Sequence, residues 1–254
     1  MRSQPSISVI VPFFNDQQHI GRCIDSLLQQ EGLDSSCELI FVNNRSEDAS
    51  ESIVENAPGV LLLREDHRGA YAARNTGIRQ AKAPILAFTD ADCEVDSDWL
   101  RSIQESMRDP SVAVLVGHFR YAPEASRLLK LLCAYENAKI EYVLNQGNPA
   151  FHFAYANNMA VRASVFSELG GFREWPRAAD TELIHRLASQ RPDLRPAYCR
   201  AMRITHLEFL GARARLARLK LYTSTNSRVG SFQELTLGRR LATFARMLRR
   251  DATL

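Results

Sequence analysis

Residues 67–93 read HRGAYAARNTGIRQAKAPILAFTDADC, and this run predicts a helix, a strand and an acidic strand end in direct succession. Its alanine-rich part, residues 70–81, favours a helix. The apolar run 84–88 has the length of a strand and no polar alternation, as expected of a strand buried on both faces. Asp90 and Asp92 follow it directly, so we expect two carboxylates where this strand ends.

The alternation of strand and helix extends over the first 116 residues. Further strands are expected at 6–11 (ended by Pro12), 38–42, 60–63 and 112–116. Further helices are expected within 16–30, at 47–55 with Ser46 as the cap, and from 96 or 97 to 107. This pattern indicates a parallel sheet covered on both faces, whose ligands bind beyond the carboxyl ends of the strands. The segments that follow those ends are 12–16, 43–48, 65–68 and 90–94.

The pattern changes after residue 120. A long helix is expected over 124–144, followed by a strand at 153–161. Two more helices are expected at 163–169 and 179–190.

Length and composition fit one large domain with a short appendage. The chain has 254 residues, of which 45% are hydrophobic, so it can bury a core. Its five cysteines have no paired short spacing, which excludes a disulfide scaffold and fits a reducing compartment. No run approaches the ~20 apolar residues of a membrane span, and the N-terminus makes a poor signal peptide. We therefore expect a cytoplasmic protein.

Basic residues concentrate near the C-terminus. Residues 201–254 contain eleven Lys or Arg and three acids, a net charge of +8, which leaves the first 200 residues at −5. Within 234–250, apolar side chains share one helical face: Leu237, Leu241, Phe244, Ala245 and Leu248. The tail 207–254 either makes a peripheral contact with the anionic inner face of a membrane or packs on its own domain. Nucleic acid is not expected, because interleaved aromatics and any known binding module are lacking.

The Asp90-Ala91-Asp92 segment has several interpretations. Two carboxylates at a strand end suit Mg²⁺ or Mn²⁺, which take further ligands from water and phosphate. A calcium-binding loop is excluded, because its sixth and twelfth positions hold Val95 and Arg101. A phosphatase-type nucleophile motif is disfavoured by Glu94. A cluster of helix-capping acids before Trp99 remains an alternative.

Three segments together carry a family resemblance: ISVIVPFFND (7–16), ELIFVNNRSEDAS (38–50) and the run 67–93. With these motifs in order, the chain resembles the family 2 inverting glycosyltransferases of the GT-A fold over residues 6–206. The resemblance implies an α/β domain over 1–206 with a Rossmann-like, mostly parallel central sheet flanked by helices. Residues 1–116 would form its nucleotide-binding half and 117–206 its acceptor-side half. Residues 207–254 would form a helical appendage.

The resemblance also assigns residues to the nucleotide. The family's Pro-x-Tyr-Asn segment packs around the base and corresponds to Pro12, Phe14 and Asn15, with Phe14 lacking the hydroxyl. Its Asp-Asp-Gly-Ser segment corresponds here to residues 43–46, ending in Ser46. Asn44 would accept a hydrogen bond from the base without carrying a charge. This departure leaves the base open, with uridine as the expectation.

Further residues follow from the same resemblance. The family's Ala-Arg-Asn-x-Gly segment is intact and includes Arg74 and Asn75, and Arg68 lies where the family often has a basic residue. Asp90 with Ala91 would contact ribose or metal-bound water.

Metal ligands also follow from the resemblance. Asp92 would bind Mn²⁺ or Mg²⁺, which stabilises the departing diphosphate. His206, placed past the sheet domain, would be a third ligand, although a lone histidine is more often a packed or surface residue.

The family's general base corresponds to Asp180, which would take the proton of the acceptor hydroxyl while the sugar is attacked with inversion. The Glu that precedes this Asp in the family is replaced by Ala179. A helix N-cap is the structural alternative for Asp180, and Glu182 is the second candidate base. Trp175 is either an acceptor platform or a packing residue.

The sequence thus predicts a metal-dependent glycosyltransferase that moves a sugar from a nucleotide diphosphate, expected to be UDP, to a glycan or lipid-linked acceptor. A role in polysaccharide or glycolipid synthesis is implied. Two rivals stay open. A degenerate, non-catalytic nucleotide-sugar-binding module is suggested by the departures at Asn43, Asn44 and Ala179. A nucleotidyltransferase is less consistent, because the loop after the first strand has neither Gly nor Lys.

Overall fold

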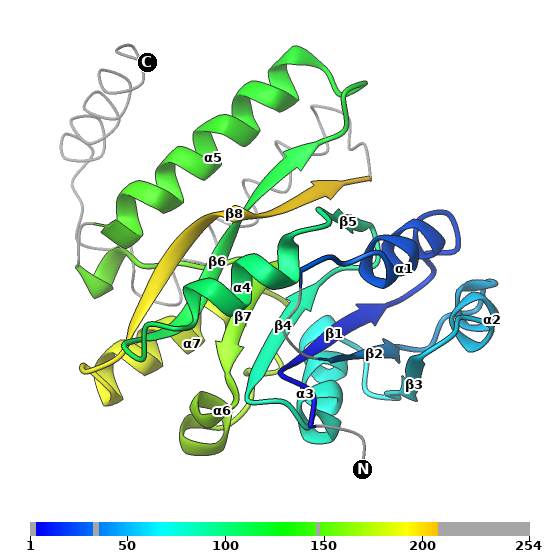
Figure 1. Ribbon diagram of the computed structural model, residues 1–254, viewed down its shortest axis with the longest axis horizontal. Coiled ribbons are helices and arrows are strands. Elements are labelled where there is room, and N and C mark those ends of the chain that lie inside the picture. Colours follow the sequence, from blue (N-terminus) through cyan, green and yellow to red (C-terminus); the bar gives the residue numbers. More distant parts are fainter. Residues whose placement is uncertain (1–3, 33–35, 146–147, 208–254) are drawn as a thin grey trace.

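The computed structural model describes residues 4–32, 36–145 and 148–207, which build one eight-stranded sheet (Figure 1). The strands are β1 (Ile7–Phe13), β2 (Cys37–Asn43), β3 (Val60–Arg64), β4 (Ile85–Thr89), β5 (Cys93–Val95), β6 (Val112–Tyr121), β7 (Asn158–Arg162) and β8 (Arg195–His206). Their order across the sheet is β3-β2-β1-β4-β7-β6-β8-β5. Both expected halves of the domain therefore contribute strands to the same sheet.

The helices cover both faces of this sheet. They are α1 (Ile20–Leu28), α2 (Ser50–Glu55), α3 (Ala70–Gln80), α4 (Trp99–Ser106), α5 (Arg127–Asn145), α6 (Ala163–Leu169) and α7 (Ala179–Gln190), with a 3₁₀ turn η1 at Pro149–Phe151. Side chains of α1, α2 and α4 share one hydrophobic core. Those of α3, α6 and α7 share a second core, and α5 contributes to both. Within β1, Val9 enters the first core and Ile10 the second, so the strand needs apolar residues on both faces.

The sheet is mixed rather than wholly parallel. Strands β3, β2, β1 and β4 run parallel, as expected, and β6 and β8 are parallel to each other. Strand β7 runs antiparallel to both β4 and β6, and β5 runs antiparallel to β8. The lack of alternation in β7 reflects burial on both faces, which a central antiparallel strand shares with a parallel one.

Two expected features near the N-terminus are wrong. The first strand does not end at Pro12: β1 continues to Phe13, because beyond Ile10 it pairs with β2 alone. Proline is tolerated where one edge of a strand is unpaired. Ser46 does not cap a helix, since α2 begins at Ser50 and the Ser46 hydroxyl accepts instead from the backbone N–H of Asn15 (3.0 Å).

The C-terminal half differs more from expectation. The strand expected at 153–161 is confined to Asn158–Arg162, because the backbone N–H of Asn158 closes a turn on the Tyr155 carbonyl (3.1 Å). Strands β5 and β8 were not expected. His206 consequently does not lie past the sheet but ends β8, opposite Cys93 of β5.

Helix α3 packs unusually close to the sheet. A Cβ atom on Gly77 would lie 2.5 Å from Cγ2 of Ile10. Real side chains never approach this closely, so only glycine lets α3 rest on β1 at this point. The expected helix over 70–81 is confirmed, and its glycine sets the distance between α3 and β1.

Asn158 fills the junction of β6, β7, β8 and α4. The register between β6 and β8 shifts after the pair Gly117 and Cys199, and the next pair is His118 with Arg203. The Asn158 carboxamide donates to the carbonyls of His118 (2.9 Å) and Met202 (3.0 Å), which lie beside the register shift. The Trp99 indole donates to its oxygen (2.9 Å). One buried amide thus satisfies the irregular stretch of the sheet.

Among the described residues, none of the helices combines the length and apolarity required to span a bilayer. The predicted amphipathic tail lies outside the described residues from 208 onward. The five cysteines are free, in line with the expected absence of a disulfide scaffold.

Replacing Asn158 by Ala is expected to lower the free energy of unfolding by about 3 kcal/mol, because it leaves two carbonyls and one indole N–H buried without partners. Urea unfolding measures the change. Asn56→Ala is the matched control, since Asn56 is exposed and makes one local hydrogen bond to Ser52. The control is expected to stay within about 0.5 kcal/mol of wild type. Equal losses in the two variants would contradict the role assigned to Asn158.

Candidate active site

A cavity of about 540 Å³ opens at the carboxyl ends of β1, β2 and β4. Its lining comes from residues 12–19 at the end of β1 and after it, Asn44 and Asp48 after β2, Ala70 at the start of α3, and residues 90–92 after β4. The chain continues from β1 to β2 on one side and returns to β4 on the other, so the cavity lies where the strand order reverses. Parallel sheets bind ligands at this position, and the sequence placed the cavity in the same loops.

The loops after β1 and β2 hold each other in place. Asn15 and Arg45 both adopt left-handed backbone conformations, with φ of 52° and 69°. The Asn15 side chain accepts from the backbone N–H of Glu47 (2.8 Å), and its own N–H donates to Ser46. Asn15 and Ser46 therefore shape the cavity wall, and Phe14 beside them is half exposed on its surface.

Asn44 is fully engaged with the backbone of the next loop. Its amide donates to the carbonyls of Glu65 (2.9 Å) and His67 (2.8 Å), and its oxygen accepts from the N–H of Gly69 (2.8 Å). These bonds position residues 65–69, including the exposed Arg68, ahead of α3. A contact between Asn44 and a nucleobase stays a prediction, and this geometry favours a positioning role.

Asp90 forms an ion pair with the buried Arg74 of α3. Burial raises the pKa of Asp90, the Arg74 guanidinium opposes the rise, and the neighbouring charge of Asp92 adds to it. Arg74 also lies over the ring of Tyr71, 5.2 Å from its centroid. Its Nε is buried and donates to no group among the described residues, so a bound acceptor would satisfy it.

Asp92 faces His206 across the β5–β8 pair. Asp92 Oδ2 lies 3.2 Å from Nδ1 of His206, whose Nε2 lies 3.1 Å from the amide nitrogen of Asn157. Burial acts to raise the pKa of Asp92, but hydrogen bonds from His206 and from the Cys93 thiol help to outweigh it, so this pKa lies below its usual value. The ring of His206 stacks on Tyr121, with centroids 5.9 Å apart.

The donor set around Asp92 fits a divalent cation. Asp92 and His206 offer an oxygen and a nitrogen close together, and Cys93 places its sulfur near both. Asp16 adds a third carboxylate: burial raises its pKa, its hydrogen bond to His19 opposes the rise, and the charges of Asp92 and Asp90 add to it. Such an accumulation of negative charge is relieved by a cation, and oxygen with imidazole suits Mn²⁺ or Mg²⁺.

Asp16 and His19 were not among the predicted site residues. Asp16 lies in the inspected segment 12–16, but only the fold shows that its charge adds to those of Asp90 and Asp92. His19 accompanies it through a contact of 3.0 Å. Their spacing resembles an ordinary helix start, so the sequence carried no separate signal for them.

Asp180 lies in the first turn of α7, two residues after the N-cap Ala178. It is therefore not the N-cap, which was the structural alternative. Its carboxylate accepts from the backbone N–H groups of Ala156 (2.9 Å) and Thr181 (2.8 Å), and the Tyr71 hydroxyl bonds to it as well. Burial raises the pKa of Asp180, and these hydrogen bonds oppose the rise.

Ala178 is held in the left-handed region, with φ of 65°. A residue with a Cβ pays about 1 kcal/mol or more for this conformation. Strain of this kind two residues before Asp180 is typical of a segment shaped for a site rather than for helix stability.

Two other predicted residues make structural contacts. Glu182 pairs with Arg186 (2.9 Å) one turn along α7, and Arg186 in turn donates to the carbonyl of Gly171 (3.0 Å). Asn75 exchanges two hydrogen bonds of 2.9 Å with the backbone of Phe172. Both side chains tie the loop before α7 to the core, and Trp175 in that loop is partly exposed.

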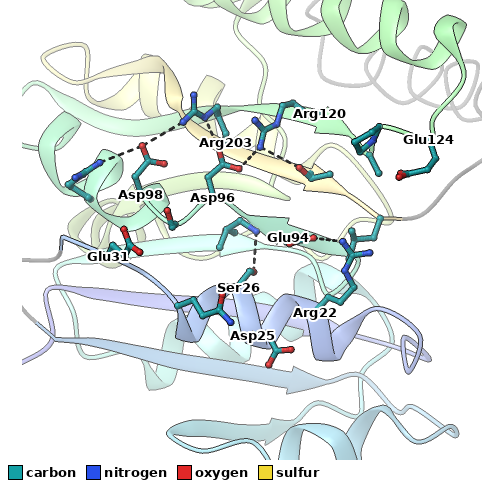
Figure 2. A pocket seen from close by; sticks show the side chains of 18 residues that line it. Arg22, Asp25, Ser26, Glu31, Glu94, Asp96, Asp98, Arg120, Glu124 and Arg203 are labelled. Carbon is teal, nitrogen blue, oxygen red and sulfur yellow. Dashed lines mark hydrogen bonds and ion pairs between the residues drawn. The ribbon is translucent and has the colours of Figure 1, made fainter.

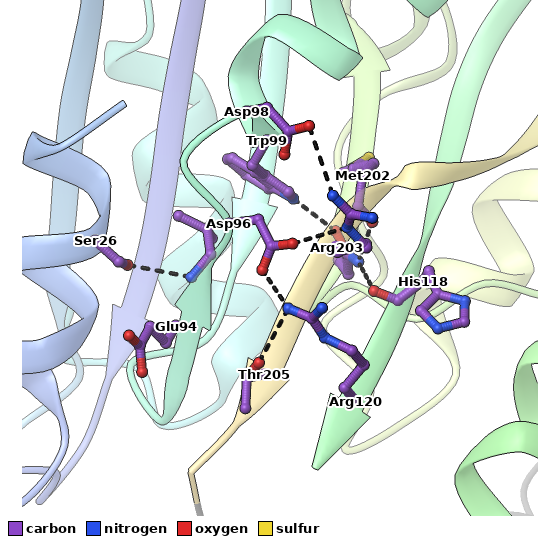
Figure 3. Close-up of polar contacts among 12 residues, drawn as sticks. Ser26, Glu94, Asp96, Asp98, Trp99, His118, Arg120, Met202, Arg203 and Thr205 are labelled. Atoms are coloured by element: carbon purple, nitrogen blue, oxygen red, sulfur yellow. Dashed lines mark hydrogen bonds and ion pairs between the residues drawn. The ribbon is translucent and has the colours of Figure 1, made fainter. Parts of the chain in front are cut away.

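A second cavity, of about 910 Å³, lies between α1, β5 and the ends of β6 and β8 (Figure 2). Its charges are largely paired with one another. Asp96 accepts from Arg120 and from Nε of Arg203 (2.7 Å) (Figure 3). Arg22 pairs with Glu94 (Figure 2). This network ties β5 to β8 three residues before His206, so its role in the site is to anchor the strand that carries the histidine.

Comparisons with known proteins agree with this geometry. Glycosyltransferase AglE of Haloferax volcanii is 28% identical over 174 residues, which cover 66% of this chain and 56% of that protein. The chain thus spans little more than half the length of this relative.

Among solved structures, mannosyltransferase PcManGT of Pyrobaculum calidifontis, in complex with GDP-Man and Mn²⁺, superimposes with a TM-score of 0.66 at 21% identity. The match covers 85% of this chain and 61% of that one. TarS 1–349 of S. aureus, in complex with UDP-GlcNAc, gives 0.64 at 17% identity, covering 81% and 59%. These likenesses establish the α/β fold with its mixed, flanked sheet as GT-A-like.

The family itself follows from the sequence match. Residues 8–170, well over half of the chain, match the family described as Glycosyl transferase family 2. They include β1 from Ser8 onward, the acidic end of β4, and β7 and α6, which precede the helix that carries Asp180. The chain belongs to glycosyltransferase family 2.

Proposed function

We propose that this chain is a metal-dependent inverting glycosyltransferase that moves a sugar from a nucleotide diphosphate to an acceptor hydroxyl. The observation that carries the proposal is that Asp90 and Asp92 line the cavity and His206 lies against Asp92. Asp180 lies beside Tyr71, which belongs to the same helix as Arg74. No one element could supply this set. A glycan or lipid-linked acceptor, in polysaccharide or glycolipid synthesis, is the expected partner.

The donor would lie in the 540 Å³ cavity. The half-exposed ring of Phe14 offers a stacking face for a base, and Pro12 and Asn15 shape the wall around it. The unpaired Nε of buried Arg74 offers a donor to a ribose or phosphate oxygen. Because residues 43 and 44 differ from the family's Asp-Asp pair, the identity of the base is less well predicted than the presence of a diphosphate. UDP remains the proposed sugar carrier.

Asp92, with His206 and with Asp90 beside it, would hold Mn²⁺ or Mg²⁺. When bound, the ion supplies positive charge to the diphosphate leaving group. Arg74 keeps Asp90 in place through their ion pair.

Asp180 would take the proton from the attacking hydroxyl, and a single displacement inverts the sugar. The backbone N–H groups of Ala156 and Thr181 fix the orientation of its carboxylate. Burial keeps its pKa above the usual carboxyl range, which makes it a stronger base than an exposed aspartate. Glu182 is less suited to this role, because Arg186 occupies it.

A non-catalytic nucleotide-sugar-binding module is the second candidate function. The departures at Asn43 and Asn44 favour it, since both amides are engaged in shaping loops. Measuring whether the nucleotide-sugar donor is slowly hydrolysed in the presence of Mn²⁺ distinguishes the two functions. The enzyme is expected to hydrolyse it, whereas a binding module would bind the donor and leave it intact.

Asp92→Asn is expected to abolish metal-dependent binding of the nucleotide. In thermal unfolding with UDP, GDP or dTDP, each with and without Mn²⁺, one nucleotide at ~100 times its dissociation constant should stabilise wild type by about 2.7 kcal/mol. The increment should require Mn²⁺ and vanish in the variant. Unfolding without ligands is the control for the variant's own stability. A nucleotide that stabilises both proteins equally would refute the metal assignment.

Asp180→Asn is expected to reduce metal-dependent donor turnover by about 10² to 10⁴-fold while leaving nucleotide binding intact. The amide keeps the shape of the side chain but cannot accept the proton. Glu182→Gln is the comparison, expected to lose less turnover because its charge serves Arg186. Near wild-type turnover in a folded Asp180→Asn protein would show that another group is the base.

The pH dependence of kcat/KM should report Asp180. Because burial raises its pKa, the carboxylate is lost as pH falls through a value above the ordinary ~3.9, and activity falls with it. A pH–rate profile of wild type should therefore show its acid limb above about pH 4. An acid limb that persists unchanged in the residual activity of Asp180→Asn would assign it to a different group.

A further inference from the structure

The contacts of His206 define which ring nitrogen carries its proton. Nδ1 lies 3.2 Å from Oδ2 of Asp92, and an ionised carboxylate only accepts hydrogen bonds. Nε2 lies 3.1 Å from the amide nitrogen of Asn157, which only donates. Both contacts are satisfied when the proton is on Nδ1 and Nε2 accepts from Asn157. In this arrangement the imidazole is neutral.

That tautomer is the wrong one for binding a cation together with Asp92. Nδ1 is the nitrogen that faces the carboxylate, so a metal shared by the two residues would need the Nδ1 lone pair. The proton must then move to Nε2. In its present orientation Asn157 turns its NH₂ group toward Nε2 of His206. A proton on Nε2 would then face another N–H group, and no hydrogen bond could form between them.

The carboxamide of Asn157 has the group needed for the other tautomer. Its Oδ1 is buried and accepts no hydrogen bond within the described part of the chain. Turning the amide over exchanges its oxygen and nitrogen and places an acceptor against Nε2–H. The backbone beside it is fixed, because Asn158 is held by three hydrogen bonds to Trp99, His118 and Met202.

The ring of His206 is itself restrained. It stacks on Tyr121, and its backbone pairs with Cys93 across β5 and with Tyr121 across β6. A change of tautomer can therefore be met by the amide of Asn157 while the ring stays in place.

We propose that Asn157 is a positioning residue that selects the metal-binding tautomer of His206, its carboxamide turning over when a divalent cation is bound. The inference rests on the proposed function, in that it takes His206 as a ligand. Metal ligands of this kind depend on an acceptor at their second ring nitrogen, and losing that acceptor typically weakens metal binding 10–100-fold.

Two variants of Asn157 make opposite predictions. Asn157→Leu removes the acceptor and should weaken Mn²⁺ binding about 10–100-fold. Asn157→Asp can only accept, so it favours Nε2–H and should bind Mn²⁺ at least as tightly as wild type. The readout is the dissociation constant of Mn²⁺ with UDP present, from the electron paramagnetic resonance signal of the free ion. A purely structural role for the amide would weaken binding in both variants or in neither, and either result overturns the proposal.

Nitrogen-15 spectra of the full chain test the tautomer without any substitution at Asn157. Wild-type His206, assigned with His206→Gln, should carry its proton on Nδ1 without metal and on Nε2 with Mg²⁺ and UDP. An unchanged Nδ1–H with the metal bound would overturn the inference.

Failure of the proposed function is distinguishable from failure of this inference. If wild type binds Mn²⁺ no better than Asp92→Asn, the metal site itself is refuted and the inference with it. If wild type binds Mn²⁺ through Asp92, and Asn157→Leu binds equally well, only the role of Asn157 is refuted.

Discussion

The carboxamide of Asn158 is the constraint on which the arrangement of this site depends. It satisfies two carbonyls where β6 and β8 lose register, and it receives the indole of α4. A Cβ atom on Gly117 would lie 2.3 Å from its nitrogen, so the amide fills a space that only a glycine leaves. Beyond this point β8 resumes its pairing and ends at His206, opposite Cys93. His206 reaches Asp92 because Asn158 bonds to the Met202 carbonyl and the pairing of β8 with β6 resumes at Arg203.

The polar side chains of the site fall into two groups: those that make structural contacts, and those that could bind a ligand or a proton. Asn44 and Asn75 donate hydrogen bonds to backbone carbonyls, and Glu182 pairs with Arg186. Asp92, Asp180 and the Nε of Arg74 keep capacity toward a ligand or proton. The carboxylates differ in the direction of their pKa shifts. His206 lowers the pKa of Asp92, whereas burial raises the pKa values of Asp90 and Asp180. One carboxylate is thereby suited to a cation and another to a proton.

The sequence predicted the nucleotide-binding half well, because strands buried on both faces and a glycine-bearing helix leave clear local patterns. The helices at 163–169 and 179–190 were also predicted to the residue. The strands β5 and β8 were missed, since three residues at a sheet edge and a strand interrupted by a register shift carry little periodicity. The roles of Asn157 and Asn158 depend on contacts over 40 residues away, which no local pattern records.

The register shift also divides β8 into two paired segments, one from Arg195 to Cys199 and one from Arg203 to His206. Residues 200–202 fall between the paired positions Cys199 and Arg203, so three residues of β8 have no partner in β6 at this point. Asn158 ties the Met202 carbonyl within this stretch, and the pairing with β6 resumes at Arg203. The end of β8 is moreover tied to β5 by Asp96 and Arg203. The end of β8 that carries His206 is therefore held by contacts with β5 and β6 that do not involve the beginning of the strand.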